Sequence, residues 1–229
     1  MTKQVIEILS ELKSDDLGKR QTVISKIYQK EIDVSIFQGF GYDFTTTILP
    51  YTSSLDKTTQ SESLSVTLDW VNYLLTQPKV NIKLYDLCMK QFVSDVYYAL
   101  NDQVETCLGF VVPFLCASSV FCTRHFSGLL KAVSFHSENH TLLIFSILKE
   151  VLSLVNRKVI FVPPLDWSAL LVLLALLFHF SDISQQHEII ETLRGMERYN
   201  TTLTTQYIST FLKSCNIQET SLYEGLMVV

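Results

Sequence analysis

Apolar side chains recur every three or four positions along most of this chain, which is the period of an α-helix with one buried face. The first 32 residues show the pattern twice, on either side of a polar turn at residues 14–20. We therefore expect an antiparallel helical hairpin from Val5 to Ile32. Its buried faces are predicted to carry Val5, Ile8, Leu9 and Leu12 in the first helix, and Val23, Ile24, Ile27 and Tyr28 in the second.

The next segment, from Asp33 to Asp56, has a weaker periodicity. It contains a lone Gly-x-Gly at residues 39–41 without the third glycine or the preceding strand of a nucleotide-binding loop. Residues 51–63 form the most polar stretch of the chain and are typical of a loop. We expect a softer domain boundary or a mobile loop near 51–61.

Two amphipathic helices are predicted after this stretch. The first starts at a capping box formed by Thr59 and Glu62 and ends before Pro78. Its apolar stripe consists of Leu64, Leu68, Val71 and Leu75. The second helix runs from Ile82 to Leu100. Its predicted apolar face consists of Tyr85, Met89, Phe92, Val96 and Leu100. Its predicted solvent-facing side consists of Lys83, Asp86, Lys90 and Asp95.

Further helices follow at short intervals. Asp102 and Glu105 are placed to cap a helix that Pro113 must kink or end near Val112. Residues 118–135 and 141–158 have helical patterns, and the turn residues at 136–140 separate them. Residues 158–162 make the best strand candidate, although they lack a partner strand. Asp182 and Gln185 form another capping pair, and a last long helix carries Leu203, Tyr207, Ile208, Phe211 and Leu212.

The segment from Pro163 to Asp182 contains no charge between Trp167 and Phe180. These 14 residues would span about 21 Å as a helix, which is shorter than the roughly 30 Å of a bilayer core. Asp166 is placed to cap the helix at its start. We expect a central buried helix and no membrane span, with peripheral membrane association through residues 167–180 as an alternative.

The predicted fold is all-α. About ten helices in antiparallel pairs form a single domain from 1 to 229, built as an α-solenoid or an irregular multi-helix bundle with a very apolar central layer. Only eight residues between Thr106 and Ser181 are charged. The rhythm of the 5–32 hairpin, the helices from Leu64 to Leu100, the Pro113-interrupted helix and residues 142–155 resembles HEAT and armadillo solenoids. That resemblance implies a scaffold that holds other proteins.

Composition removes several classes of function. Hydrophobic residues make up 48% of the chain, charged residues make up 18%, and the net charge is −5. A nucleic-acid-binding surface needs a basic excess, so we expect no direct nucleic-acid contact. No signal peptide opens the sequence and the cysteine count is odd, which favours buried thiols in an intracellular, cytoplasmic or nuclear protein that is not secreted. The five cysteines are Cys88, Cys107, Cys116, Cys122 and Cys215.

Candidate chemistry is sparse. The candidates for a metal cluster are Cys107, Cys116, Cys122 and His125, but only Cys122 and His125 have the spacing of zinc ligands. The pair of His136 and His140 lies in a predicted turn. No nucleophile motif is present, so we expect no metal, no cofactor and no enzymatic activity. An enzyme with a dispersed site that one sequence does not reveal is the remaining alternative.

The predicted function is therefore a non-enzymatic scaffold or complex subunit that binds other proteins, as part of a hetero-complex more than a homo-oligomer. A nuclear or chromosome-associated assembly is one setting for such scaffolds, and no residue specifies it. Aromatic-rich segments are the candidate partner-binding surfaces, although each of these residues is equally suited to a core. The candidates are Phe37, Phe40, Tyr42, Phe44, Tyr97, Tyr98, Phe121, Phe126, Tyr223, Leu226 and Met227.

Overall fold

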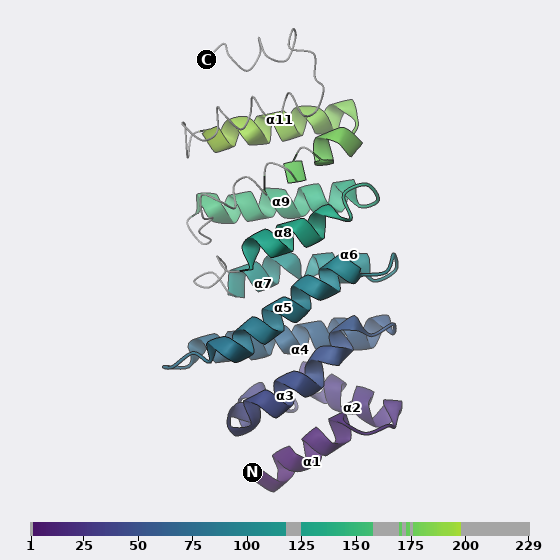
Figure 1. Cartoon of the computed structure of the whole chain (residues 1–229), viewed down its shortest axis with the longest axis vertical. Coiled ribbons are helices and arrows are strands. Elements are labelled where there is room, and N and C mark those ends of the chain that lie inside the picture. Colours follow the sequence, from purple (N-terminus) through teal and green to yellow (C-terminus); the bar gives the residue numbers. More distant parts are fainter. Residues whose placement is uncertain (1, 118–124, 158–169, 171–172, 175, 198–229) are drawn as a thin grey trace. The chain divides into compact units, whose positions relative to one another are not determined.

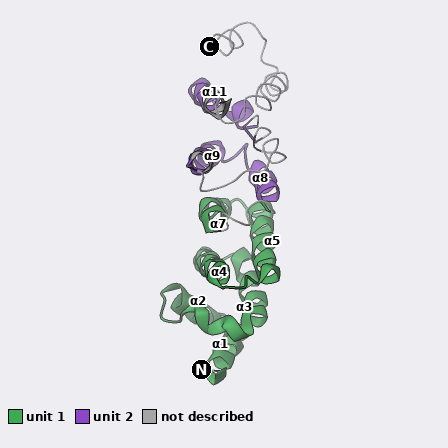
Figure 2. Cartoon of the chain, turned by 90° about the vertical axis from the view of Figure 1, so that its left-hand side faces the viewer, with its two compact units in different colours: residues 1–125 green, residues 126–229 purple. Residues whose placement is uncertain are grey.

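The computed structural model describes residues 2–117, 125–157, 170, 173–174 and 176–197. The chain divides into two compact units, one comprising Met1–His125 and the other Phe126–Val229 (Figure 2). The division lies at His125, whereas the sequence suggested one domain with a softer boundary near 51–61. Every element in the described residues is a helix, which confirms the all-α prediction.

Unit 1 is built from two layers of helices (Figures 1 and 2). One layer packs α1 (Thr2–Leu12), α3 (Gly41–Ile48) and α5 (Ile82–Tyr98) in succession. The other packs α2 (Leu17–Tyr28), α4 (Lys57–Thr76) and α7 (Val111–Ala117). The short 3-10 helices η1 (Val34–Phe40) and η2 (Leu49–Ser53) flank α3, and α6 (Val104–Gly109) precedes α7. Each helix thus touches its chain neighbour and the next helix of its own layer.

The predicted hairpin is confirmed. Its apolar faces are buried at seven of the eight expected positions, and only Tyr28 is exposed. Asp16 begins α2 as its N-cap, because its carboxylate accepts hydrogen bonds from the backbone N–H groups of Gly18 and Lys19. Lys30 ends the helix in the left-handed region with φ of 65°. The backbone bonds from Lys30 to Ile27 and from Glu31 to Lys26 complete a Schellman turn.

The loop predicted near 51–61 is wrong, because only residues 54–56 separate η2 from α4. Asp56 is the N-cap, and its carboxylate accepts the Thr59 backbone N–H at 2.7 Å. The helix therefore starts one turn before the predicted Thr59–Glu62 box. The polar side chains in this turn form contacts between helices: Gln21 donates to Thr59 at 3.1 Å and Ser25 donates to Glu62 at 2.7 Å. Polar composition here indicates a packed face and not a loop.

The buried face of α4 also differs from the predicted stripe. Leu64 and Val71 are buried as expected, but Leu68 and Leu75 are partly exposed. Trp70 and Leu74 take their place in the interior. The α5 prediction is confirmed for Tyr85, Met89, Phe92 and Val96, whereas Leu100 is exposed beyond the end of the helix and Asp95 is buried. A face with mixed polarity allows several rotations of the helix, and packing selects one of them.

Pro113 acts as predicted, by interrupting a helix. The helix is interrupted at Phe110, between α6 and α7. Pro113 therefore lies in the first turn of α7, where its missing N–H costs no hydrogen bond. The predicted cap from Asp102 to Glu105 is wrong, because the N-cap of α6 is Gln103 and its side chain makes no cap bond. That side chain instead accepts the Leu100 backbone N–H at 3.2 Å and donates to the Ser54 carbonyl at 2.7 Å.

Unit 2 contains α8 (Phe126–Ser134), α9 (Thr141–Asn156) and α11 (Ile183–Glu197), and the predicted turn joins α8 to α9. The capping pair is confirmed, since Asp182 accepts the Gln185 backbone N–H at 2.9 Å and Gln185 accepts from Asp182 at 3.4 Å. In the apolar run, the side chains of Leu170, Leu173, Leu174 and Leu177 are fully buried. Asp166, the strand candidate at 158–162 and the helix around 203–212 lie outside the described residues.

Candidate functional site

The structure separates the predicted partner-binding aromatics into three groups. Phe37, Phe44 and Phe126 are core residues, so a partner cannot reach them in the folded chain. Phe40 and Tyr97 are half-buried. Tyr42 and Tyr98 are exposed, and they lie on different helices. Phe121 and the terminal set of Tyr223, Leu226 and Met227 lie outside the described residues.

Leu55, Tyr98 and Leu100 are exposed apolar side chains at the start of α4 and the end of α5, and we call this set the apolar corner. Their exposed fractions are 73%, 74% and 54%. Leu55 precedes the start of α4. Tyr98 is the last residue of α5 and Leu100 follows it, and these two helix ends lie on the same side of unit 1 (Figure 1). Gln103 joins the two loops by bonding both Ser54 and Leu100. The apolar corner is thus held in shape although it faces solvent.

Acidic residues lie close to the apolar corner in the sequence. Asp56 follows Leu55 in the chain, and the exposed Asp102 and Glu105 follow Leu100. Lys57 is the one basic residue within two positions of Leu55. The Asp56 carboxylate accepts from the Thr59 side chain and backbone, and these hydrogen bonds hold its pKa below the ordinary value. The rim therefore carries net negative charge at neutral pH.

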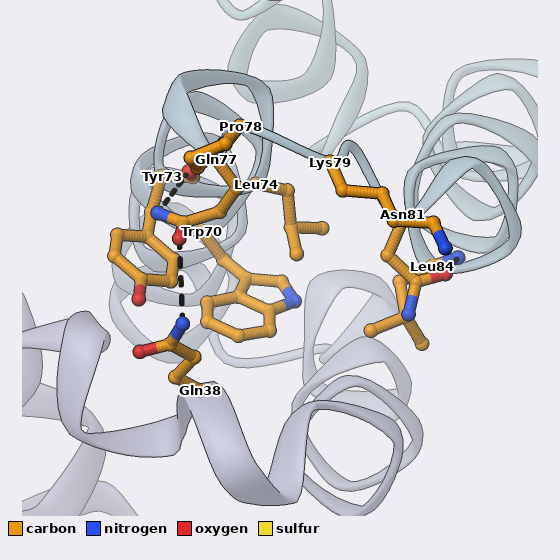
Figure 3. Close-up of a pocket in the computed structure, with 9 residues that line it drawn as sticks. All are labelled: Gln38, Trp70, Tyr73, Leu74, Gln77, Pro78, Lys79, Asn81 and Leu84. Atoms are coloured by element: carbon orange, nitrogen blue, oxygen red, sulfur yellow. Dashed lines mark hydrogen bonds between the residues drawn. The ribbon is translucent and has the colours of Figure 1, made fainter.

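A second feature of unit 1, which we call the Trp70 pocket, opens where α4 turns into α5. Its volume is about 330 Å³. Figure 3 shows the side chains that line it, with the Trp70 ring in the centre, Gln38 below it and Lys79 to its upper right. The lining residues are Gln38, Trp70, Tyr73, Leu74, Gln77, Pro78, Lys79, Asn81 and Leu84.

The floor of the Trp70 pocket is fixed by close packing. Trp70 is fully buried, and its indole N–H donates to Thr45 Oγ1 at 2.9 Å. Its ring meets Phe44 edge-on at 5.2 Å and stacks on Tyr73 at 5.4 Å between centroids. A Cβ at Gly41 would approach Leu84 Cδ1 to 2.9 Å and Trp70 Cζ2 to 3.2 Å. Close neighbours therefore surround the indole ring on several sides.

The walls of the Trp70 pocket are rich in carboxamides. Gln38 Nε2 donates to Gln77 Oε1 at 3.4 Å, and Gln77 Nε2 donates to the Tyr73 carbonyl at 3.3 Å (Figure 3). Asn81 is the N-cap of α5 through its bond from the Leu84 backbone N–H. Lys79 is the one charged residue among the nine that line the pocket. These groups hydrogen-bond well and contain no nucleophile with a base beside it.

A buried carboxylate lies elsewhere in unit 1, at Asp95 on α5. It accepts hydrogen bonds from Thr52 and Ser53 at 2.6 Å and from Gln91 at 2.7 Å. Burial raises the pKa of Asp95 above its ordinary value, although the three hydrogen bonds oppose that shift. Its oxygens are already used by η2 and its own helix, so this carboxylate joins two elements of the fold.

Among the residues that the structure describes, the cysteine and histidine candidates do not form a metal site, and Cys122 lies outside those residues. Burial raises the pKa of the Cys107 thiol to about 12, and Gln60 donates to its sulfur at 3.4 Å. Burial also raises the pKa of Cys88 to about 12, while Cys116 is exposed. His125 bonds to Asp86 at 3.0 Å. In the described ranges, no group of three or more histidine, cysteine and acidic residues is placed to hold a metal ion.

Comparison of the chain with protein-family models, with curated proteins and with solved structures finds no match, so the site is interpreted from its own geometry. None of the helices that the structure describes has the length and apolar character needed to cross a membrane.

Sequence reasoning identified Tyr97 and Tyr98 but missed Leu55, Leu100 and the Trp70 pocket. Leu55 stands in a polar stretch, and Leu100 occupies a regular position of an apolar stripe. Only the end of α5 at Tyr98 removes Leu100 from the buried face. The sequence contains a partial indication of the pocket, because Gln77, Pro78 and Asn81 predict a helix end followed closely by a helix start.

Proposed function

We propose that this chain is a non-enzymatic helical scaffold or complex subunit, and that it binds a partner protein through the apolar corner. The observation that carries the proposal is the exposure of Leu55, Tyr98 and Leu100 at two helix ends whose adjoining loops are joined by the hydrogen bonds of Gln103 to Ser54 and Leu100. A large exposed apolar surface on an ordered scaffold is typical of a protein-binding site, and tyrosine is enriched among the residues that dominate such interfaces.

The two-layer packing of unit 1 supports the same proposal. Successive helix pairs build an elongated surface in which loops are held by the layers behind them, and helical repeats use such surfaces for binding. Asp56, Asp102 and Glu105 give this region an acidic character, which is complementary to a positively charged partner. The partner segment would therefore combine apolar residues with lysine or arginine.

Quantitative affinity purification with mass spectrometry tests the proposal. The test variant is Leu55→Ser/Tyr98→Ser/Leu100→Ser. The matched control is Ile6→Ser/Leu17→Ser/Tyr28→Ser, which removes three exposed apolar side chains elsewhere in unit 1. Both variants must retain the wild-type circular dichroism. We expect a stoichiometric partner with wild type and control, and at least about a tenfold loss with the test variant, equivalent to about 1.4 kcal/mol.

Charge reversal at the rim provides a second measurement. Asp102→Lys/Glu105→Lys should slow association with that partner and reduce the salt dependence of binding, because rim charges act mainly on the association rate. Equal partner recovery by wild type, control and test variant would refute the apolar corner as the binding site.

A further inference from the structure

We propose that the Trp70 pocket binds a short extended peptide segment that carries a carboxylate. This site is distinct from the apolar corner, because the two lie at opposite ends of α4. Leu55 precedes the first turn of this 20-residue helix, and Gln77 follows its last turn. At about 1.5 Å per residue these ends are about 30 Å apart, so one site can be altered without touching the other.

The carboxylate follows from the charge of the pocket. Lys79 is its single charged lining residue, and no aspartate or glutamate lines it. A cationic residue in a lining that is otherwise uncharged favours an anionic partner, and a carboxylate forms a charge-assisted hydrogen bond with an ammonium group. A phosphate group would ordinarily call for several cationic or backbone donors.

The side-chain amides of the pocket favour a peptide as the ligand. Gln38, Gln77 and Asn81 each carry a donor and an acceptor in the same plane, as a peptide group does. They can therefore pair with the N–H and C=O groups that an extended segment leaves unpaired. The Tyr73 ring adds a flat, half-exposed apolar surface against which a side-chain stem can lie. A volume of about 330 Å³ is at the lower end for ligand pockets, which suits a short segment.

The pocket is also formed in advance of any ligand. Trp70 is held by Thr45 below and by Gly41 at its edge, and Gln77 is oriented by both Gln38 and Tyr73. Side chains that are already ordered lose little conformational entropy on binding. A preformed site with fixed amides is therefore able to bind weakly interacting peptide groups.

Nuclear magnetic resonance titration of the full 229-residue chain tests this proposal with three small probes. Acetyl-glutamate methylamide carries the carboxylate on a side chain, acetyl-glutamine methylamide replaces it with an uncharged amide, and acetyl-alanine carries it at a C-terminus. The signals to follow are the side-chain amides of Gln38, Gln77 and Asn81 and the Trp70 indole N–H. Trp167 provides the reference indole, because the chain has two tryptophans.

We expect saturable shifts of these signals with the glutamate probe and at least about fivefold weaker binding of the glutamine probe, as fits the loss of one partly solvated charge-assisted bond. Lys79→Gln should weaken the glutamate probe by a similar factor. Lys83→Gln is the matched control, since Lys83 is exposed on α5 and does not line the pocket. Tighter binding of acetyl-alanine would identify a C-terminal carboxylate as the source.

Three results would overturn the proposal: no shift at the pocket, glutamate and glutamine probes that bind within twofold of each other, or equal effects of Lys79→Gln and Lys83→Gln. The Leu55→Ser/Tyr98→Ser/Leu100→Ser variant should bind the glutamate probe as wild type does. If partner binding at the apolar corner is refuted, binding of the glutamate probe to the Trp70 pocket is still expected. The two proposals can therefore fail separately.

Discussion

The indole N–H of Trp70 donates a hydrogen bond of 2.9 Å to the hydroxyl of Thr45, and both residues are fully buried. The bond joins α4 to α3 beneath the Trp70 pocket. Thr45→Val keeps the shape of the side chain but removes the acceptor, which leaves a buried donor unpaired. We expect a loss of about 1–3 kcal/mol in the free energy of unfolding, measured by urea denaturation of unit 1.

Thr46→Val is the control for that substitution. Thr46 is exposed one position further along α3, and its hydroxyl bonds only to carbonyls of its own helix. Its effect should stay within about 0.5 kcal/mol. Equal losses for the two variants would show that the hydrogen bond to Trp70 contributes nothing specific to stability.

The buried carboxylate of Asp95 should be more sensitive to truncation than to neutralisation. Asp95→Ala leaves Thr52, Ser53 and Gln91 without their shared acceptor, and we expect it to cost about 2–4 kcal/mol. Asp95→Asn keeps an acceptor oxygen and removes the buried charge, so it should cost less. Chemical denaturation monitored by circular dichroism measures both. The prediction fails if Asn is as destabilising as Ala.

Asp95 should also give stability a pH dependence of known sign. The pKa of Asp95 is raised in the folded chain above the ordinary 3.8. At pH values between these two pKa values, the folded state therefore keeps a proton that the unfolded state has released. This contribution is present at low pH and is lost as the pH rises through the folded pKa. The stability of wild type relative to Asp95→Asn should therefore decline as the pH rises above the ordinary pKa of 3.8, until Asp95 is ionised in the folded chain as well. A flat difference would contradict the raised pKa.

Alanine substitutions at Gly41 and Gly39 compare a closely packed glycine position with an open one. A methyl group at Gly41 would contact Leu84 and Trp70, whereas one at Gly39 would meet nothing within 4 Å. Gly41→Ala should destabilise the chain by about 1 kcal/mol through overpacking and should shift the fluorescence of Trp70. Gly39→Ala should be neutral or slightly stabilising. A neutral Gly41→Ala would mean that the pocket floor adjusts freely.

The start of α4 distinguishes the observed cap from the predicted one. Asp56→Ala removes the carboxylate that accepts the Thr59 backbone N–H and should cost about 1 kcal/mol. Because these hydrogen bonds lower the pKa of Asp56, its contribution is present above the unfolded pKa and is lost as the pH falls. Asp56→Asn should retain most of the stability. Thermal unfolding of the three proteins at neutral and acid pH provides the measurement.

Leu173 tests whether the apolar run is interior. Its side chain is fully buried, so Leu173→Asp places an unpaired charge in the core and should cost more than about 4 kcal/mol, enough to unfold unit 2. Leu142→Asp is the control, because Leu142 is 66% exposed in the first turn of α9, where a negative charge is tolerated. A cooperatively folded Leu173→Asp protein would show that this side chain faces outward.

The helical class and most helix positions were readable from the sequence, because a 3.6-residue apolar period and local caps act within a few residues of each other. Val5, Ile27 and Met89 lie on the faces that this period predicts, and the Asp182–Gln185 cap forms as its spacing requires. Pro113 interrupts its helix for an equally local reason, the lack of a backbone N–H.

Burial of polar side chains and exposure of apolar ones were decided only by tertiary structure. Thr59, Gln60 and Asp95 are buried, and each forms a hydrogen bond with a residue of another element: Gln21, Cys107 and Thr52, respectively. Nothing near them in the chain specifies those partners. Leu55 and Leu100 are 45 positions apart in the sequence. Their loops are brought together because Gln103 forms hydrogen bonds with both Ser54 and Leu100. Local periodicity determines that a helix forms, whereas long-range packing determines which of its faces meets solvent.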